Sequence, residues 1–482
     1  MTFSRPIGYS LLAGLSFLVV LGPLLTRLDP FVAIVLSLGL LGGVLWALKS
    51  IEDPFWVALP LCLSAFLGGI FTEVFELTLP ITPFQLMFIL AIGLWTIHRT
   101  IKAHRLTLLG LEWPVAALVA LACFSMLYSV NVEEGLLRLL RVSLNFVFVF
   151  YLYQVIQTKR QLIILLASIT VLLTALAGYA AIFTILNPEQ TAINIQLRGI
   201  GVASRAAITD ADPNIFASSL LVGVAFTTAL LHSRTVPAWQ RMAALGSLLI
   251  LTAGVLSTYS RSSWVAVAIL AAFIIWQLKN FRFVWLGLGA AIVAVVTIPQ
   301  VQVLLFSVAD RALSLLDPSS DSSSSIRLLL GKASLEMFAD SWGFGVGYRD
   351  FSYEFARRYD RYAITYVNEP HNISYQMLAE LGLAGFLLFH GIILAIGRWG
   401  WHSMQRVRSS IGSWDHLLGI TLLGTFLAYF VFHQFLPRFL TNAPLMVTLG
   451  LLLAYVKIQR KESAIKDSES LQNSPSQQLE HS

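Results

Sequence analysis

Long apolar segments constrain this chain more than any other feature of its sequence. A helix that crosses a bilayer needs about 20 mostly apolar residues, and about 14 such segments recur along the chain. They lie at roughly 8–26, 31–49, 54–71, 82–98, 113–130, 136–156, 161–186, 214–232, 239–257, 261–278, 283–299, 371–397, 414–434 and 439–456. Only 12% of the 482 residues are charged, too few to cover a soluble protein of this size. The sequence therefore predicts an all-α polytopic membrane protein with about 12–14 transmembrane helices, and it excludes a soluble enzyme or a DNA-binding protein.

The distribution of lysine and arginine predicts the orientation of these spans. Basic residues recur in the short loop after every second span, and such loops stay in the cytoplasm. The residues concerned are Arg99, Lys102, Arg105, Lys159, Arg160, Arg234, Arg241, Lys279, Arg282, Arg398, Arg406, Arg408, Lys457, Arg460 and Lys461. We therefore expect a multi-pass protein of a plasma membrane with both termini in the cytoplasm.

Two outer segments, about 187–213 and 300–370, are longer than the other loops. Loops beyond roughly 12–15 residues are usually functional or disordered. Residues 326–340 follow a serine run that we expect to cap a helix, and their apolar residues share one helical face. These apolar residues are Ile326, Leu329, Leu330, Ala333, Met337 and Phe338. A second, aromatic-rich helix is expected over 351–362, and both helices should lie on the outer membrane surface and cover a cavity.

This pattern divides the chain into three regions. Residues 1–186 are expected to form N-terminal transmembrane helices. Residues 187–460 would form the functional region, including the large outer loop at 300–370. The last region, 461–482, is rich in Ser, Gln and Glu, a composition typical of a disordered tail, which would be cytoplasmic.

An excess of arginine on the outer side runs against the usual bias. The residues are Arg27, Arg138, Arg141, Arg198, Arg205, Arg261, Arg311, Arg327, Lys332, Arg349, Arg357, Arg358, Arg361 and Arg438. A planar guanidinium binds phosphate oxygens bidentately, so the cluster indicates an anion site suited to a pyrophosphate. The alternative is pairing with carboxylates of the same loops or with lipid headgroups. Pairing is the better interpretation of any single arginine, and a site is the better interpretation of the cluster.

His371 is the sharpest single candidate for chemistry. Of nine histidines, only His371 and His433 reach the expected outer boundary. His371 follows Pro370 where a long apolar helix begins, and proline is favoured in a first helical turn. The helix dipole and nearby arginines disfavour imidazolium and leave a ring that accepts a proton, whereas Glu369 acts in the opposite direction. A histidine that only caps the helix or hydrogen-bonds at the interface is the alternative.

Several common motifs are absent from the sequence. There is no P-loop, no HExxH and no GxSxG, so nothing requires ATP, and a metal is optional. Asp210-Ala211-Asp212 resembles a metal-binding carboxylate pair, but its continuation as Asp-Pro-Asn is equally typical of a turn. Cys62 and Cys123 are the only cysteines and lie inside apolar runs, which argues against a disulfide framework.

An ordered set of motifs over roughly 190–400 is similar to the O-antigen ligase and Wzy-type polymerase superfamily. In order, the set consists of Arg198-Gly199, Asp212-Pro213-Asn214, Tyr259-Ser260-Arg261, Ile326-Arg327, Gly343-Phe344-Gly345-Val346-Gly347, Pro370-His371-Asn372, Gly382 and Gly385. Ten residues separate His371 from Gly382, as between the corresponding histidine and glycine of the ligases. The first seven spans match this superfamily only in being hydrophobic.

The resemblance implies a metal-independent membrane glycosyltransferase with a GT-C-like fold and no cofactor. Such enzymes move a glycan from an undecaprenyl-pyrophosphate carrier to a glycan or lipid acceptor, at the outer face of the bacterial inner membrane. Their partners are these substrates and membrane lipids, not nucleic acid. By the same resemblance, His371 would be the base that deprotonates the acceptor, and Arg261 would act on the donor pyrophosphate. The further pyrophosphate-binding residues would be Arg198 or Arg205, Arg327 and Asn372.

Two other functions compete with this one. Some cyanobacterial members of the superfamily have been labelled bicarbonate transporters, and an outward arginine cluster also suits a small anion. A carrier, however, usually needs ionisable groups near the bilayer centre, and the expected spans are nearly free of charge there. The other alternative is a transport-associated protein, a non-catalytic partner of a glycan export complex. Ligase and polymerase share a donor and differ in the acceptor, so both remain open.

Overall fold

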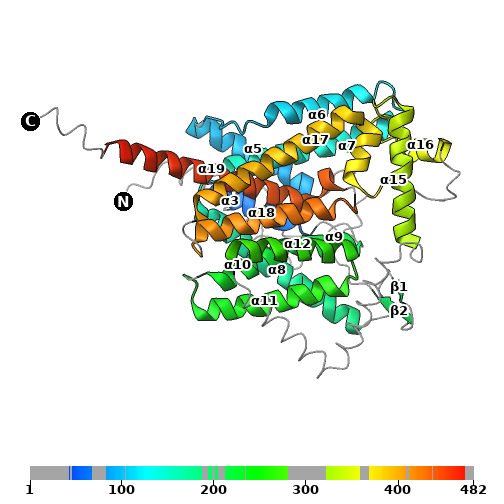
Figure 1. Ribbon diagram of the computed structural model, residues 1–482. Coiled ribbons are helices and arrows are strands. Elements are labelled where there is room, and N and C mark those ends of the chain that lie inside the picture. Colours follow the sequence, from blue (N-terminus) through cyan, green and yellow to red (C-terminus); the bar gives the residue numbers. More distant parts are fainter. Residues whose placement is uncertain are drawn as a thin grey trace, which may run out of the picture. The chain divides into compact units, whose positions relative to one another are not determined.

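Long helices dominate the computed structural model of the chain (Figure 1). The structure describes residues 43, 46–67, 83–103, 105–186, 194–197, 201–204, 212–233, 235–279, 322–358, 369–408, 412–436 and 438–472. A short antiparallel hairpin of β1 (Asn194–Leu197) and β2 (Gly201–Ser204) interrupts them. The expected spans at 8–26 and 283–299, and most of 31–49, lie outside the described residues. Every other expected span contains a helix, which confirms an all-α polytopic membrane protein.

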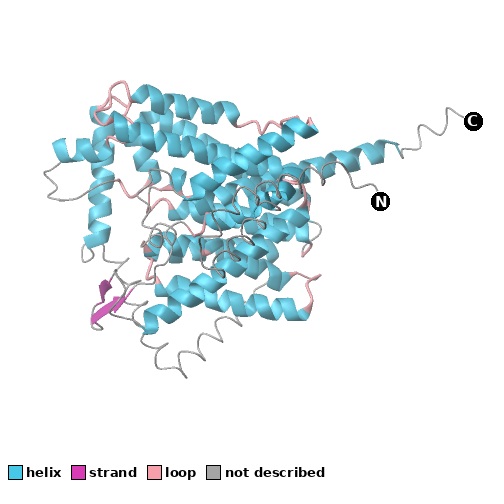
Figure 2. Ribbon diagram, turned by 180° about the vertical axis from the view of Figure 1, so that it is seen from behind, coloured by secondary structure: helices cyan, strands magenta, loops and turns pink. Residues whose placement is uncertain are grey.

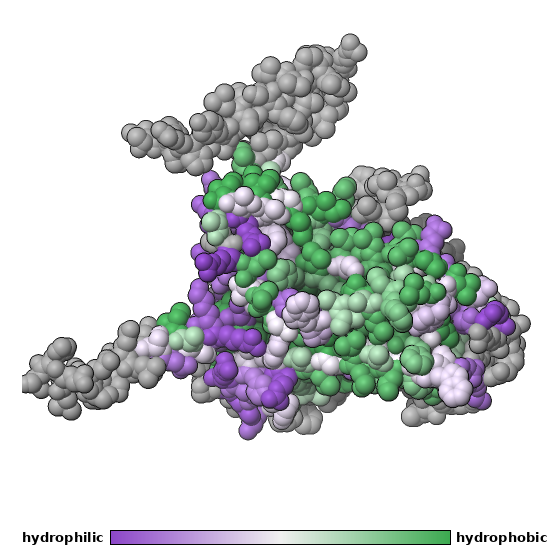
Figure 3. All heavy atoms as spheres, turned by 90° about the horizontal axis from the view of Figure 1, so that it is seen from above, coloured by the Kyte–Doolittle hydropathy of each residue, from purple (hydrophilic) through white to green (hydrophobic). Residues whose placement is uncertain are grey.

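Within the described residues, eight helical segments are long and apolar enough to cross a membrane. They are α5 (Pro83–Lys102), α7 (Val132–Val155), α8 (Lys159–Leu186), α9 (Pro213–Ser219) continued by α10 (Leu221–His232), α11 (Ala238–Ser257), α12 (Arg261–Leu278), α17 (Ile373–Arg406) and α18 (Trp414–Phe432). The apolar helices α3 (Phe55–Ser64) and α6 (Glu112–Ser125) are shorter. Apolar residues cover much of the face seen in Figure 3, as expected of helices that contact lipid.

The chain forms two compact units, one containing α3 and α5 and the other containing the helices from α6 onward. In the second unit α7 packs against α19 (Ala443–Gln472), α10 packs against α8, α11 and α18, and α12 packs against α18. The long helices of this unit run roughly side by side in Figures 1 and 2. Helix α15 (Ser322–Asp340) runs across their ends. It therefore forms a crossbar at one end of the bundle.

The expected amphipathic helix is present, but its start differs from the prediction. Helix α15 begins at Ser322, inside the serine run rather than after it. Once a helix is nucleated, each added residue gains a backbone hydrogen bond, so weak helix formers can extend its start. The predicted apolar face is confirmed, because Leu330, Ala333 and Met337 are buried in one hydrophobic cluster.

Helix α16 (Phe351–Arg358) and α17 complete this cluster. Phe351 and Phe355 pack on the buried face of α15, together with Ala379 of α17. The aromatic-rich helix predicted over 351–362 is confirmed as far as Arg358, and its last residues lie outside the described part of the chain. The crossbar is thus held on the bundle by apolar contacts.

The start of α17 corrects the prediction for Pro370. The helix begins at Ile373, so Pro370 precedes the N-cap instead of occupying the first turn. Asn372 is the N-cap, and its side chain accepts a hydrogen bond from the Tyr375 amide at 3.0 Å. Asparagine is among the best N-cap residues. His371 has a φ of 55°, which is incompatible with a right-handed helix.

The other end of the chain also differs from expectation. Helix α19 continues to Gln472, through the first half of the segment expected to be a disordered tail, and 473–482 lie outside the described residues. Extension of an existing helix needs no new nucleus. Glu462 of this extension forms an ion pair with Lys159, at 2.6 Å between Nζ and Oε2.

A glycine-rich turn, residues 343–347, joins α15 to an interruption in α17. At Gly382 the backbone leaves the helical conformation, with φ 65° and ψ −162°. The carbonyl of Glu380, released from the helix, accepts a hydrogen bond from the Gly347 amide at 3.1 Å. Because buried backbone groups need partners, this pairing replaces the lost helical bonds. The glycine turn therefore ties the crossbar to α17.

Candidate functional site

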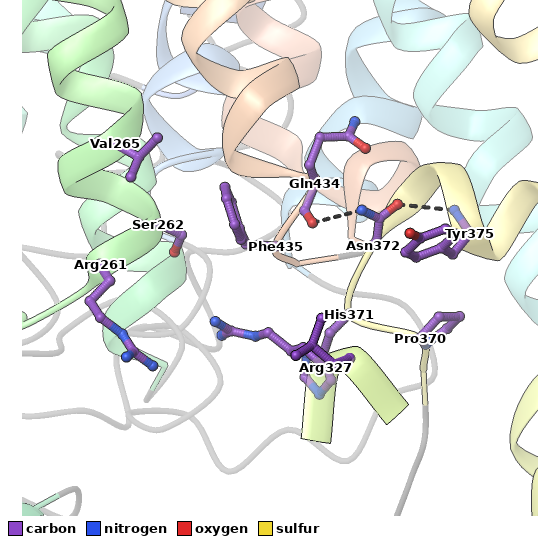
Figure 4. Close-up of a pocket in the computed structure, with 11 residues that line it drawn as sticks. Arg261, Ser262, Val265, Arg327, Pro370, His371, Asn372, Tyr375, Gln434 and Phe435 are labelled. Atoms are coloured by element: carbon purple, nitrogen blue, oxygen red, sulfur yellow. Dashed lines mark hydrogen bonds between the residues drawn. The ribbon is translucent and has the colours of Figure 1, made fainter. Parts of the chain in front are cut away.

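Four elements of the second unit enclose a cavity of about 260 Å³. Helices α12 and α15 form two of its walls, and the segment that precedes α17 and the turn that follows α18 form the others (Figure 4). The described residues that line it are Arg261, Ser262, Val265, Arg327, Leu328, Pro370, His371, Asn372, Tyr375, Gln434 and Phe435. Four of the residues predicted from the sequence thus meet at one place: Arg261, Arg327, His371 and Asn372.

Arg261 enters the cavity from the first residue of α12. It is 6% exposed, and Ser260 before it is the N-cap of the helix. The Ser260 hydroxyl lies 2.9 Å from that of Ser263. A helix N-terminus carries partial positive charge, so the guanidinium and the helix end favour an anion in the same place.

Arg327 reaches the cavity from α15, on the opposite side. In Figure 4 the Arg261 and Arg327 side chains extend toward the same space from different helices. Gly331, one turn after Arg327, allows the close approach, because a β-carbon there would lie 2.9 Å from the Tyr375 ring. The glycine thereby brings α15 against the start of α17 and sets Arg327 beside His371.

The charge of the lining favours a strongly anionic ligand. Two guanidinium groups face the cavity, and none of its described lining residues carries a carboxylate. Planar guanidinium groups bind phosphate oxygens in pairs. Among the described residues, no three His, Cys, Asp or Glu side chains come together as metal ligands.

His371 borders the cavity with a ring that favours the neutral form. Its Nδ1 is buried and has no hydrogen-bond partner among the described residues. Burial lowers the pKa of His371, and the charges of Arg327 and Arg438 lower it further, against the opposing effects of Glu369 and Asp212. Because Asn372 supplies the helix cap, His371 is not the capping residue. A neutral imidazole in this place can accept a proton.

His433, the other histidine expected near the outer boundary, has a structural role. Its side chain is fully buried, with Nδ1 2.7 Å from the Leu436 carbonyl. Burial lowers the pKa of His433 to about 4. Its own carbonyl accepts a hydrogen bond from the Ile373 amide at 3.1 Å. His433 therefore anchors the first residue of α17, and His371 lines the cavity.

Both polar atoms of the Asn372 side chain form hydrogen bonds within the protein. Its oxygen caps α17, and its nitrogen donates to the Gln434 carbonyl at 2.9 Å, as Figure 4 shows. Pyrophosphate binding by Asn372 stays a prediction. Gln434 and Phe435 were not predicted as site residues, because no motif marks them and only packing brings them to this place.

Several of the arginines expected on the outer side form ion pairs with carboxylates of nearby segments, as the alternative interpretation held. These pairs are Arg138–Glu369, Arg349–Glu369, Arg349–Glu134 and Arg357–Glu354. Arg198 and Arg205 lie outside the described residues, so their roles stay predictions.

Of the two aspartates that precede α9, the structure describes Asp212. Asp212 is the N-cap of α9, and its carboxylate accepts a hydrogen bond from the Asn214 amide at 2.8 Å. This contact confirms the turn interpretation for Asp212. Asp210 lies outside the described residues.

One family of known proteins resembles part of this chain. No curated protein matches the chain. Residues 246–390 match a family model described as O-antigen ligase. The matched segment runs from the middle of α11 into α17 and carries Arg261, Arg327 and His371. This match confirms the resemblance seen in the motifs for this part of the chain, which is similar to the O-antigen ligase and Wzy-type superfamily.

Proposed function

We propose that this membrane enzyme transfers or polymerises a glycan from an undecaprenyl-pyrophosphate carrier, at the outer face of a bacterial plasma membrane. One observation carries the proposal. Arg261 and Arg327 extend from two helices into one cavity, and His371 lies on its border. The family match, which implies lipid-linked glycan substrates, supports the same choice. Both chain termini are proposed to be cytoplasmic, in agreement with the basic loops.

The proposed reaction is a single displacement at the anomeric carbon of the donor sugar. The acceptor hydroxyl oxygen forms the new bond, and its proton passes to His371. The bond from the anomeric carbon to the phosphate oxygen breaks, and the pyrophosphate leaves with the electron pair. Arg261 and Arg327 would stabilise the charge that grows on this leaving group. Arg198 or Arg205 would add to the same anion site.

The lowered pKa of His371 is consistent with the role of a base. A base must be unprotonated at the working pH, and a positioned base contributes about 10²–10⁴-fold in rate. A lipid pyrophosphate is already an activated leaving group, so the reaction requires no nucleotide.

Deletion and complementation test the proposal in cells. The gene is deleted in its host and replaced by the wild type or by Arg261→Ala, Arg327→Ala or His371→Ala. Arg357→Ala is the matched control, because this outer-loop arginine pairs with Glu354 on its own helix, with Nη2 to Oε1 at 2.9 Å. We expect long surface polysaccharide to be lost with the three site variants and kept with the control, at equal protein levels in the membrane. Normal polysaccharide from His371→Ala would exclude it as the base.

Gel electrophoresis of the surface polysaccharide from these strains distinguishes the two reactions of the superfamily. Loss of long chains with single repeat units still attached indicates a polymerase, and loss of every attached unit indicates a ligase. Purified protein in liposomes provides the test against transport. Release of undecaprenyl pyrophosphate from a lipid-linked donor supports the proposal, whereas bicarbonate uptake in the absence of any glycan carrier contradicts it.

A further inference from the structure

Two arginines clamp the carboxylate that precedes His371 by two residues. Oε1 of Glu369 lies 2.8 Å from Nη1 of Arg349 and 3.3 Å from Nη2 of Arg138. The three side chains are only 11–18% exposed. Charge-assisted hydrogen bonds of this kind are roughly twice as strong as neutral ones. The clamp therefore fixes the position of Glu369.

The two arginines of the clamp come from different parts of the fold. Arg138 belongs to α7. Arg349 follows the glycine turn that is hydrogen-bonded to α17, and its Nε donates to Glu134 of α7 at 3.0 Å. The clamp thus joins α7, the glycine turn and the segment that leads to His371.

The backbone of His371 explains why such a clamp is needed. Its φ of 55° lies in the left-handed region, which costs a non-glycine residue roughly 1–2 kcal/mol. Such conformations persist only where the surroundings hold them. Here the chain is held by Glu369 on one side and by Asn372 on the other, with the rigid Pro370 between Glu369 and His371.

We propose that Glu369 is a positioning residue for His371, and that Arg138 and Arg349 hold Glu369 rather than the donor. The proposal rests on the role of His371 as the base in the proposed function. It assigns a role to Arg138 and Arg349, which do not line the cavity.

The clamp also sets the charge that His371 experiences. The charged groups with the largest effect on its pKa are Arg327, Glu369, Asp212 and Arg438. Glu369 raises the pKa of His371, and its two arginine partners counter that charge. Removal of the carboxylate charge should therefore lower the pKa of His371. Removal of an arginine partner should raise it, because the carboxylate charge is then less compensated.

Three variants separate position from charge. Glu369→Gln keeps an oxygen that accepts from Arg349 but loses the charge. Glu369→Ala removes the carboxylate altogether. Arg349→Gln removes the arginine that makes the shorter of the two contacts with Glu369. For Glu369→Ala we expect kcat to fall roughly 10- to 100-fold, with the donor KM unchanged. Glu369→Gln should retain most of kcat. Arg357→Gln is the control.

The decisive measurement is the acid limb of the profile of kcat/KM against pH, where the rate falls as His371 becomes protonated. We expect it to move to lower pH in Glu369→Gln and to higher pH in Arg349→Gln, each by roughly half a pH unit. If the ion pair were merely structural, the two substitutions would not move the acid limb in opposite directions. Shifts of the same sign, or none, would overturn the proposal. A donor KM raised in Arg349→Gln as much as in Arg327→Lys would also overturn it, because Arg349 would then bind the donor.

A chemical measurement distinguishes failure of this inference from failure of the proposed function. Diethyl pyrocarbonate acylates neutral imidazole, and mass spectrometry of the peptide that contains His371 follows its titration in the purified protein without any substrate. If the wild type transfers no glycan, or His371→Ala remains active, the proposed function fails. If His371 is essential but its titration is unmoved in Glu369→Gln and Arg349→Gln, only the positioning role fails.

Discussion

A β-carbon added to Gly382 would lie 2.1 Å from the carbonyl oxygen of Gly343. This contact between the break in α17 and the glycine turn leaves no room for a side chain at residue 382. The amide of Leu383 donates to the same carbonyl at 2.9 Å. Arg327 lies on α15 and His371 precedes α17. The close backbone contact between Gly343 and Gly382 therefore helps to set the distance between Arg327 and His371.

Gly382→Ala should destabilise the protein by at least about 2 kcal/mol, because alanine is strained at a φ of 65° and its methyl group would overlap the Gly343 carbonyl. Gly391→Ala, on the same helix, is the matched control. A β-carbon there meets nothing within 4 Å, so this change should be neutral or slightly stabilising. Thermal unfolding of the detergent-purified variants measures both effects. Equal stabilities of the Gly382→Ala and Gly391→Ala proteins would show that the close contact between Gly343 and Gly382 does not stabilise the structure.

Arg327→Lys should raise the donor KM by roughly 10-fold, and Arg327→Ala by more, because lysine keeps the charge but loses the planar fork. Lys332→Ala is the control, since Lys332 is exposed on the same helix. Steady-state transfer from a purified lipid-linked donor provides the measurement. An unchanged KM in both variants would remove Arg327 from the donor site.

The rate of transfer should fall on the acid side with a midpoint below 6.5, the ordinary pKa of histidine. The sign follows from the role of the residue. A base acts when neutral, and burial together with Arg327 lowers the pKa of His371, so activity persists to a lower pH than for a free imidazole. A profile of kcat/KM against pH gives the midpoint. His371→Gln should lose most of the rate and this acid limb with it, and an unchanged limb in that variant would assign the titration to another group.

Asn372→Ala should destabilise the protein by about 1 kcal/mol, because the variant loses the N-cap of α17. Asn372→Ser retains a capping oxygen and should stay near wild-type stability. Thermal unfolding and the donor KM are measured together. A higher KM in a stable Asn372→Ser protein would show that the amide contacts the pyrophosphate as well as capping the helix.

Cysteine labelling tests the orientation of the membrane spans. Trp342 is 90% exposed after α15, so Trp342→Cys should react with a membrane-impermeant maleimide in intact spheroplasts. Arg408→Cys, beyond the end of α17, should react only after lysis. Both variants are made in a background with Cys62→Ala and Cys123→Ala. The opposite pattern would place the cavity on the cytoplasmic side and contradict the proposed topology.

Most helices could be predicted because their signals are local. The length of an apolar run and the spacing of apolar residues are properties of short stretches, and α8, α11 and α12 follow them closely. The errors lie at element ends, where local signals compete. At the start of α17, Asn372 caps the helix in place of Pro370, and at the end of α19 helix propagation prevails over a polar composition.

The sequence by itself determined that the protein is a bundle of membrane helices, and its motifs singled out Arg261, Arg327 and His371. Only the tertiary structure decided that these three side chains border one cavity. It also decided that Arg138 and Arg349 are engaged by Glu369, and that Gln434 and Phe435 line the same cavity. The physical reason is that hydrophobic length acts within a segment, whereas the pairing of charges depends on how distant segments pack.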